Sequence, residues 1–364
     1  MRKSPHLIII ADDLTGSGDA GLFFASSSKS PSIVFYSQLA SLKKISAPVI
    51  LIDTESRFCP AREAARRQEL VIKFLKKRLS GNFLIYKKID STLRGNIIAE
   101  TKKILQNLPV RGKIPVIVAF PRQKRYTIGG WQYVGRTRLD KTPFALDPRN
   151  RLVTANVQQL FERIARAKFF VHDCQTQNQL KKIAKDIFQQ MLKTQIAIGS
   201  AAVLEEIARI YYHQKINYPF ISRKYRFLRP NLLLVNGSAN PLSHQQIEFL
   251  QRKCLLPKNI FLTIISAPKE KSSPALVQKN ILRLARQIIR QENITTIIIA
   301  GGETAFNLIK FLKIKSLKII GAVEPGISIM SDGQFIFFLK PGGFGSKDIL
   351  KKIIQFITRA GFLL

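Results

Sequence analysis

Two adjacent carboxylates, Asp12 and Asp13, directly follow an apolar run and precede a glycine-rich segment. The apolar run, Leu7–Ile10, is short and bounded by turn residues, which is typical of a buried strand. Ligands of α/β sheets bind where such strands end. Asp12 and Asp13 are therefore candidates for orienting or deprotonating a substrate hydroxyl.

Polar side chains also follow two other strand-like runs. Thr54, Glu55, Ser56 and Arg57 come after the run 49–52, and the segment 87–96 comes after the run 83–86. An arginine can bind a carboxylate through two parallel hydrogen bonds, and an aspartate can accept hydrogen bonds from hydroxyls. These loops predict a pocket for a small hydroxy acid.

The segment 87–96 also has a plain structural interpretation, because Asp90 or Ser91 could cap a helix that begins there. For one loop alone we would prefer that interpretation. Three polar loops at three strand ends favour a binding site, whose candidate residues are Asp12, Asp13, Arg57, Lys88, Asp90, Ser91, Thr92 and Arg94.

Three loops in the second half of the chain are rich in glycine and lie at expected strand-to-helix junctions. They are residues 236–238, 301–304 and 342–346. Free backbone amides at a helix N-terminus attract phosphate, and glycine lets the phosphate approach closely. No G-x-x-x-x-G-K-[ST] segment occurs, so a P-loop is excluded.

Gly16, Gly18 and Gly21 form a G-x-G-x-x-G pattern, which allows the alternative of a nicotinamide-dependent oxidoreductase. In that fingerprint the first glycine makes the turn directly after the strand. Here five residues intervene, and two of them are carboxylates that would repel a pyrophosphate. The spacing therefore disfavours this alternative.

The net charge of +36 allows a second alternative, a nucleic-acid-binding protein. The basic residues are spread over helices and turns, which is typical of solvated helix faces and indicates no specific nucleic-acid partner. The three cysteines have no zinc or disulfide spacing, and no apolar run reaches the ~18 residues of a membrane span. We expect a cytoplasmic protein with no membrane association.

Elements that position these loops follow from hydrophobic periodicity. Residues 61–79 have an apolar helical face, and strand-like runs at 115–120, 168–171, 195–198, 232–235, 295–299, 317–320 and 335–339 alternate with helical segments. Ser243 and Gln246 have the spacing of a capping box. The segment 211–230 lacks periodicity and is interpreted as a connector, so we expect domains at residues 1–225 and 226–364, each a mainly parallel sheet flanked by helices.

Several segments together resemble the four-carbon acid sugar kinase family. They are ADDLTG at 11–16, KKIDSTLRGN at 87–96, AFPRQKRYTIGG at 119–130, GSA at 237–239, GGET at 301–304, EPGI at 324–327 and KPGGFGSKD at 340–348. The resemblance runs through the whole chain in the family's order. It implies a sugar-acid-binding N-terminal domain, a nucleotide-binding C-terminal domain, and phosphorylation of threonate, erythronate or 3-oxo-tetronate by ATP with Mg²⁺.

The resemblance also implies roles for single residues. Asp13, Arg57, Lys88, Asp90, Ser91 and Thr92 would contact substrate, and Ser238, Gly301, Gly302, Glu303, Thr304, Gly343 and Gly345 would contact ATP. The active site would lie in the interdomain cleft, with Asp13 or Asp12 as the catalytic carboxylate. Metal ligands stay unassigned, and a homodimer is the candidate assembly.

Two departures from the family pattern bear on the substrate. Gln123 and Lys124 stand where the family usually has a small residue and glycine before the arginine that is Arg125 here, which predicts a different loop shape. Ala202 stands where the family's G-S-A-G segment has its last glycine.

Overall fold

The computed structural model describes residues 5–25, 30–42, 45, 47–79, 82–147, 151–165, 168–212, 220–221, 231–253, 256, 260–268 and 273–361. The chain packs as two compact units, one of Met1–Phe24 with Pro31–Lys215 and the other of Ala25–Ser30 with Ile216–Leu364. The predicted boundary at residue 225 falls outside the described residues and stays a prediction.

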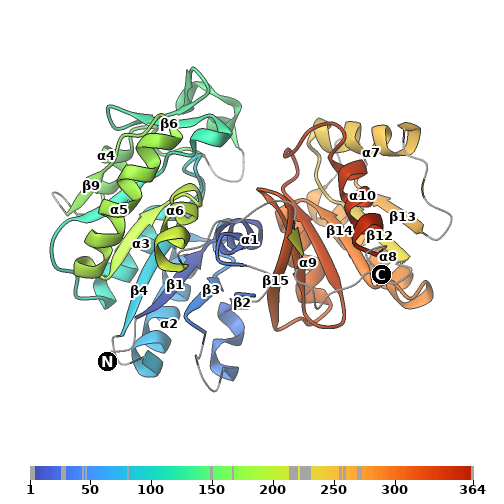
Figure 1. Ribbon diagram of the computed structural model, residues 1–364, viewed down its shortest axis with the longest axis horizontal. Coiled ribbons are helices and arrows are strands. Elements are labelled where there is room, and N and C mark those ends of the chain that lie inside the picture. Colours follow the sequence, from blue (N-terminus) through green and yellow to red (C-terminus); the bar gives the residue numbers. More distant parts are fainter. Residues whose placement is uncertain are drawn as a thin grey trace. The chain divides into compact units, whose positions relative to one another are not determined.

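The first unit contains a seven-stranded parallel sheet in the order β2-β3-β1-β4-β10-β5-β9 (Figure 1). Its strands are β1 (His6–Ala11), β2 (Ser32–Phe35), β3 (Val49–Asp53), β4 (Phe83–Lys88), β5 (Ile114–Ile117), β9 (Phe169–Val171) and β10 (Ile196–Gly199). Every residue of β3 and β4 is buried, as expected for strands covered on both faces.

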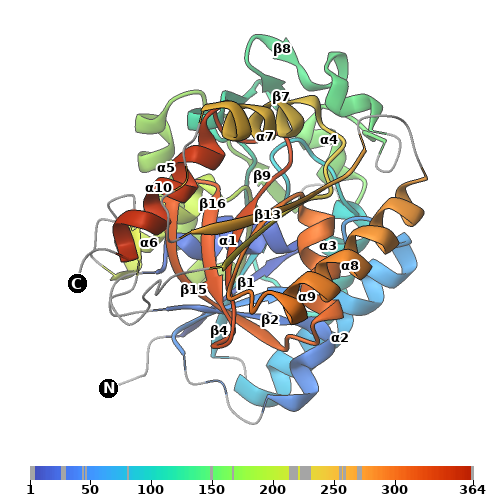
Figure 2. The same cartoon turned by 90° about the vertical axis from the view of Figure 1, so that its right-hand side faces the viewer.

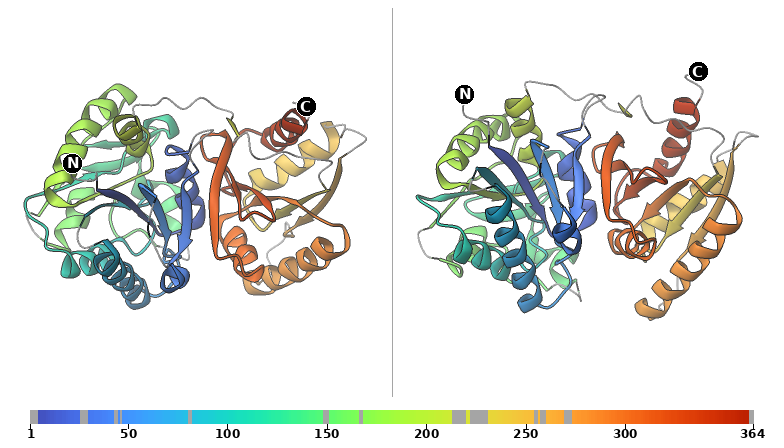
Figure 3. Two further views of the ribbon diagram at one scale, coloured as in Figure 1. Left: turned by 60° about the horizontal axis from the view of Figure 1, so that its bottom comes forward. Right: turned by 90° about the horizontal axis from the view of Figure 1, so that it is seen from below.

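Helices cover both faces of this sheet. The pair α2 (Ala61–Leu79) and α3 (Ile97–Asn107) packs together, as does the pair α5 (Gln177–Thr194) and α6 (Ala202–Tyr212). Figure 3 shows the strands between the two pairs. The remaining helices of this unit are α1 (Leu14–Leu22) and α4 (Val157–Glu162), with short 3₁₀ turns at Tyr36–Ser41, Pro121–Gln123, Leu139–Lys141 and Pro143–Leu146.

A small antiparallel sheet, which the sequence analysis did not predict, belongs to the same unit. It consists of β6 (Arg125–Ile128), β7 (Trp131–Val134) and β8 (Thr137–Arg138). Gly129 and Gly130 have φ of 56° and 76° and connect β6 to β7. A Gly-Gly pair between two aromatic and β-branched runs is a hairpin signal that the sequence contained.

The second unit has a sheet in the order β13-β12-β14-β17-β16-β15 (Figure 2). Its strands are β12 (Asn231–Asn236), β13 (Phe261–Ser266), β14 (Thr296–Ala300), β15 (Ser316–Glu324), β16 (Ile327–Ser331) and β17 (Ile336–Lys340), and the short β11 (Phe220–Ile221) pairs antiparallel with β15 outside this order. The first four in the order are parallel, but β17-β16 and β16-β15 pair antiparallel, so this sheet is mixed. Turns of two and four residues link β15 to β16 and β16 to β17, too short for the crossover that parallel strands need.

Two helices cover each face of this second sheet. They are α7 (Pro241–Lys253) with α10 (Ile349–Gly361), and α8 (Pro274–Gln291) with α9 (Gly302–Phe311). No helix among the described residues is long and apolar enough to cross a membrane.

Two local predictions are wrong. Ser243 lies inside α7, which begins at Pro241, and the Asn240 side chain accepts a hydrogen bond from the amide of Leu242 at the helix start. Ser243 and Gln246 are buried, so tertiary contacts and not capping explain these polar residues. The second wrong prediction is the start of the connector at residue 211, because α6 continues to Tyr212.

Candidate functional site

Arg57 joins the two adjacent carboxylates at the carboxyl end of β1. Its Nε and Nη2 donate to Oδ2 and Oδ1 of Asp12 at 2.9 and 2.8 Å, and its Nη1 donates to Oδ2 of Asp13 at 2.7 Å. Backbone hydrogen bonds from Ser56 and Arg57 to the carbonyl of Asp12 fix the loop after β3 against the end of β1. Parallel pairing of β1 with β3 thus brings two of the predicted loops together.

The two carboxylates differ in their surroundings. Burial is the largest effect and alone would raise the pKa of Asp12, but the charge and hydrogen bonds of Arg57, together with the charges of Lys88 and Lys87, hold the pKa below its usual range. Asp13 is more exposed and caps α1, accepting hydrogen bonds from the amide of Gly16 at 3.0 Å and the hydroxyl of Thr15 at 2.6 Å. Asp13 is therefore the carboxylate better placed to meet a ligand.

Lys88 is the cation of this cluster that keeps its ammonium available. It is 6 % exposed, and no hydrogen bond or ion pair joins its ammonium to another described residue. A Cβ atom on Gly16 would collide with both the Asp13 carboxylate and the Lys88 ammonium, so these two groups lie next to the glycine. A buried cation without a hydrogen-bond or ion-pair partner is a strong candidate for binding a substrate anion.

Asp90 and Ser91, in the loop after β4, do not cap a helix, because α3 begins only at Ile97. Asp90 accepts hydrogen bonds from the Thr92 hydroxyl and from Arg94 Nε, the latter at 2.7 Å. Burial opposes the ionised form of Asp90, yet the charges of Arg94 and Arg57 lower its pKa strongly. Ser91 is half-buried, and its carbonyl accepts a hydrogen bond from Gln132 of β7.

A buried ion pair joins β4 to α3 next to these loops. Lys87 and Glu100 are 2.6 Å apart with side chains 0 and 1 % exposed, and Glu100 also accepts a hydrogen bond from Ser56. Asn96 donates to the carbonyls of Ser56 and Cys59 at 2.7 and 2.9 Å. These contacts connect the loop after β3 to the loop after β4.

Sequence analysis missed two charged residues of this cluster. Burial raises the pKa of Asp19, on α1, to about 6 against the opposing charge of Lys88, and its buried Oδ1 has no hydrogen-bond partner among the described residues. Burial lowers the pKa of Arg125, whose guanidinium lies 5.0 Å from the ring of Phe144. Asp19 lies one turn along α1 from Thr15, so the i, i+4 spacing from Thr15, whose hydroxyl donates to Asp13, could have identified it.

The loop before Arg125 contains a turn that suits glycine. Lys124 has a φ of 54° and ends the 3₁₀ turn Pro121–Gln123 in the left-handed conformation. The glycine expected from the family pattern would adopt that conformation without strain. The lysine therefore adopts the left-handed conformation at a cost in backbone strain.

Gly16, Gly18 and Gly21 lie within α1 and not in the turn before it. Asp13 occupies the helix N-terminus, where the dinucleotide fingerprint requires the pyrophosphate. The nicotinamide alternative is therefore incompatible with the structure of this loop.

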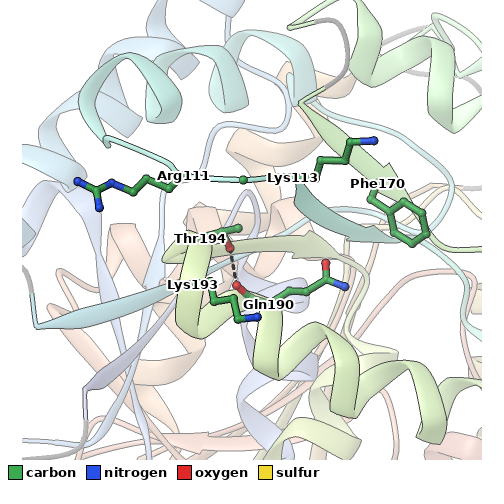
Figure 4. A pocket seen from close by; sticks show the side chains of 7 residues that line it. Arg111, Lys113, Phe170, Gln190, Lys193 and Thr194 are labelled. Carbon is green, nitrogen blue, oxygen red and sulfur yellow. Dashed lines mark hydrogen bonds between the residues drawn. The ribbon is translucent and has the colours of Figure 1, made fainter.

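A separate cavity of about 330 Å³ lies beside the start of β5 and the end of α5 (Figure 4). It contains none of the predicted site residues. Arg111, Lys113 and Lys193 line it, but Figure 4 shows that these cations point apart and do not converge on one point.

In the second unit, the glycine loops contact one another. Ser238 lies against Gly342, where a Cβ would collide with its hydroxyl, and a Cβ on Gly343 would lie 2.6 Å from Nδ2 of Asn240. A Cβ on Gly301 would lie 3.5 Å from the Thr304 hydroxyl and 3.6 Å from the amide of Ser238. Parallel pairing of β12, β14 and β17 places all three loops at the carboxyl edge of the sheet.

The other residues predicted for ATP lie in the same loops. Gly302 and Glu303 form the first turn of α9, with Glu303 exposed, and Gly345 has a φ of 86° in the loop before α10. The structure thus groups the predicted residues into two sets, one in each compact unit.

Comparisons with known proteins match both units. Residues 7–169 match the family model described as a sugar-binding N-terminal domain, and residues 265–350 match a nucleotide-binding C-terminal domain. A D-threonate kinase of Salmonella typhimurium is 34% identical over 155 residues, covering 42% of this chain and 36% of that protein. In the first three curated relatives, the alignment spans about a third of the relative's length (36%, 33% and 31%).

Longer but weaker similarities cover nearly the whole chain. A D-threonate kinase of Bordetella bronchiseptica is 23% identical over 98% of this chain and 99% of its own. The crystal structure of a Haemophilus influenzae protein superposes with a TM-score of 0.71 at 19% identity, over 96% of this chain and 100% of that one, which shows a shared fold. With both domain models matched in order, the chain belongs to the four-carbon acid sugar kinase family.

Proposed function

We propose that this protein is an ATP-dependent kinase that transfers the γ-phosphate to a hydroxyl of a four-carbon sugar acid of the threonate, erythronate or 3-oxo-tetronate type. The observation that carries the proposal is the cluster in which Arg57 braces Asp12 and Asp13 beside the unpaired ammonium of Lys88. The names of the curated relatives, D-threonate, D-erythronate and 3-oxo-tetronate kinases, support the substrate class.

The polar groups of the cluster suit an acid with several hydroxyls. Lys88 would bind the substrate carboxylate, and Arg94, Ser91 and Thr92 would contact its hydroxyls with Asp90. Arg57 uses three nitrogens on Asp12 and Asp13, so we assign it the additional role of orienting both carboxylates. Asp13 would accept the proton of the reacting hydroxyl, because its side chain is 16% exposed whereas that of Asp12 is 3% exposed.

Phosphoryl transfer depends chiefly on positioning and on neutralising charge, because the transition state is loose. Ser238, the loop Gly301–Thr304 and the loop Gly343–Gly345 would hold the phosphates of ATP through backbone amides and helix N-termini. Because the reacting hydroxyl must lie in line with the γ-phosphate, we propose that the two ligand sites meet in an interdomain cleft.

Mg²⁺ commonly binds kinases through substrate phosphates and one or two carboxylates. Among the described residues no group of three or more His, Cys, Asp or Glu side chains could hold a metal by itself. Glu303 is the one carboxylate within the three glycine loops, so this donor set fits a Mg²⁺ ion that enters with ATP. There the ion would neutralise charge on the phosphates.

Assembly and location complete the proposal. The crystal structure of a Bordetella bronchiseptica protein, with a TM-score of 0.50 and 22% identity, is described as a domain-swapped dimer with bound citrate, which supports a homodimer here. The cytoplasmic location and the absence of a specific nucleic-acid partner stay predictions.

A coupled assay of ADP release tests the proposal. We expect ADP release that requires a four-carbon acid and that differs among D-threonate, D-erythronate and 3-oxo-tetronate. If ADP release does not depend on any acid in the panel, the assignment as a kinase is contradicted. A binding function without catalysis would then be the hypothesis to test.

A further inference from the structure

Lys340 has an unusual environment at the end of β17. Its side chain is fully buried, and its ammonium donates to the carbonyls of Pro341, Gly342 and Phe344 at 3.0, 2.6 and 3.3 Å. These three hydrogen bonds match the three donors of an ammonium group. The chain from Pro341 to Ser346, here called the 341–346 loop, is therefore wrapped around one positive charge.

Helix α7 holds further carbonyls of the same loop. The Gln246 side-chain amide lies within hydrogen-bond distance of the carbonyls of Phe344, Gly345 and Ser346 at 3.1, 3.3 and 3.0 Å, and the Ser243 hydroxyl donates to the carbonyl of Gly342 at 2.5 Å. All carbonyls from Pro341 to Ser346 except that of Gly343 thus have a polar side chain as partner.

The amide of Phe344 donates to the carbonyl of Pro341 at 3.1 Å, but other amides of the loop are left for another partner. Those of Gly343, Gly345 and Ser346 donate no hydrogen bond to another described residue. Successive free amides in a tight loop form a concave anion-binding surface, and a cation beneath them adds to the positive potential. The carbonyls of the 341–346 loop are bound on its inner side, and free amides remain on its other side. This arrangement suits a loop that binds phosphate.

We propose that Lys340 is a positioning residue for nucleotide binding, whose ammonium gathers the carbonyls of the 341–346 loop and leaves its amides free for the phosphates of ATP. This inference rests on the proposed function, and it assigns Lys340 no contact with the reacting atoms. A merely structural role would stabilise α10 and β17 without any specific effect on nucleotide affinity.

The proposal predicts a pH dependence with a defined sign. Burial lowers the pKa of Lys340 to about 8. No charge interaction contributes to this shift. The elements around Lys340 carry the following charged or titratable side chains: His244, Glu248, Arg252 and Lys253 of α7, Glu303 and Lys310 of α9, Lys347 and Asp348 just before α10, and Lys351, Lys352 and Arg359 of α10.

Above pH 8 the neutral amine has two donors for three carbonyls, so the loop loosens and ATP binds less tightly. Stability should not fall in parallel, because a lysine with a lowered pKa favours its neutral form in the folded chain. Between pH 8 and 10.5 the unfolded chain therefore holds more protons at this site, and this group's contribution to stability rises with pH.

The test measures the Kd for ATP by calorimetry at pH 7 to 9.5, with melting temperatures recorded in the same buffers. We expect the wild-type Kd to rise about tenfold over this range, the value of one hydrogen bond to a charged group. The terminal phosphate titrates with a pKa near 6, so its ionisation is complete below this pH range. A constant wild-type Kd through pH 8 would overturn the proposal.

Variants separate Lys340 from other titrating groups. Lys340→Arg stays charged throughout the range, so its Kd for ATP should not change with pH. Lys340→Met should bind ATP about tenfold more weakly at pH 7 and also lose the pH dependence. Lys318→Met, at an exposed lysine of β15, is the matched control and should behave as wild type.

These measurements distinguish a wrong role for Lys340 from a wrong assignment of the nucleotide site. A wild-type chain that binds no ATP at pH 7 contradicts the nucleotide site itself. ATP binding whose pH dependence is the same in wild type and Lys340→Arg contradicts only the role of Lys340. If Lys340→Met does not fold, the wild-type and Lys340→Arg profiles still decide.

Discussion

Asp13 and Asp12 are neighbours in sequence, but their hydrogen bonds give them different tasks. Arg57 takes both oxygens of Asp12, whereas Asp13 shares its oxygens among Gly16, Thr15 and Arg57 and stays partly exposed. The sequence could not separate the two carboxylates, because the distinction depends on where the guanidinium of a residue 44 to 45 positions away is placed.

Asp13→Asn tests the role of the second carboxylate. An amide cannot accept the hydroxyl proton, so we expect kcat to fall by roughly 10² to 10⁴-fold while the Kd for ATP is unchanged. Steady-state kinetics and calorimetry measure the two quantities. Asp140→Asn, at an exposed carboxylate of the same unit, is the control. Near wild-type turnover in Asp13→Asn would make Asp13 only a helix cap.

Asp19 gives a prediction about stability and pH. Its folded pKa of about 6 exceeds the ordinary 3.8, so between these values the folded chain holds more protons than the unfolded chain. The contribution of this carboxyl to stability is therefore lost as the pH rises through 6. Asp19→Asn should be more stable than wild type by about 3 kcal/mol at pH 7 and equal to it near pH 4.

Urea unfolding at both pH values measures this difference, with Asp186→Asn of α5 as an exposed control. An Asp19→Asn variant that is less stable than wild type at pH 7 would mean that the carboxylate forms a favourable charged contact with Lys88.

At the scale of elements, apolar strands and amphipathic helices were predictable and polar residues within helices were not. The runs at 7–10 and 83–86 and the helix at 61–79 coincide with β1, β4 and α2, because each has a complete pattern of buried side chains. Ser243 and Gln246 had the spacing of a capping box, but they lie inside α7 and bind a loop about 100 residues away. No local pattern contains that information.

Lys124 shows the same limit in a loop. Substitution of the family's glycine predicts a different loop shape, which stays a prediction, and the backbone at Lys124 has the left-handed conformation with φ of 54°. The surrounding hairpin and the hydrogen bond from Gly135 to the carbonyl of Lys124 hold the turn in place of the residue's own preference.

Gly343→Ala tests the 341–346 loop without straining its backbone, since only Gly345 of the loop's glycines has a positive φ. The added methyl group would lie 2.6 Å from the Asn240 amide and narrow the approach to the loop. We expect the Kd for ATP to rise about tenfold, equivalent to about 1.4 kcal/mol, with a normal thermal shift from the sugar acid.

Ser316→Ala, at an exposed position of β15, is the control for this substitution. An unaltered thermal shift with ATP in Gly343→Ala would remove this position from the nucleotide site. Equal losses with both ligands would indicate general destabilisation.

At the scale of the whole molecule, the two compact units divide the chemistry. Charged and hydroxyl side chains gather at the strand ends of the first unit, and glycine loops gather at the strand ends of the second. Alternation of strands and helices predicted this organisation, although the antiparallel strands β15 and β16 made the second sheet mixed. The charge of +36 would accelerate encounters with anions in general, including the proposed ligands, without specifying any of them.

The most direct test follows the phosphate itself. ATP labelled in its γ-phosphate is incubated with the protein, Mg²⁺ and D-threonate, D-erythronate or 3-oxo-tetronate, and the products are separated by anion-exchange chromatography. The account predicts that the label appears in a phosphorylated four-carbon acid and that Asp13→Asn abolishes most of this transfer. Label found only in inorganic phosphate, or retained in ATP with every acid, would contradict a sugar-acid kinase.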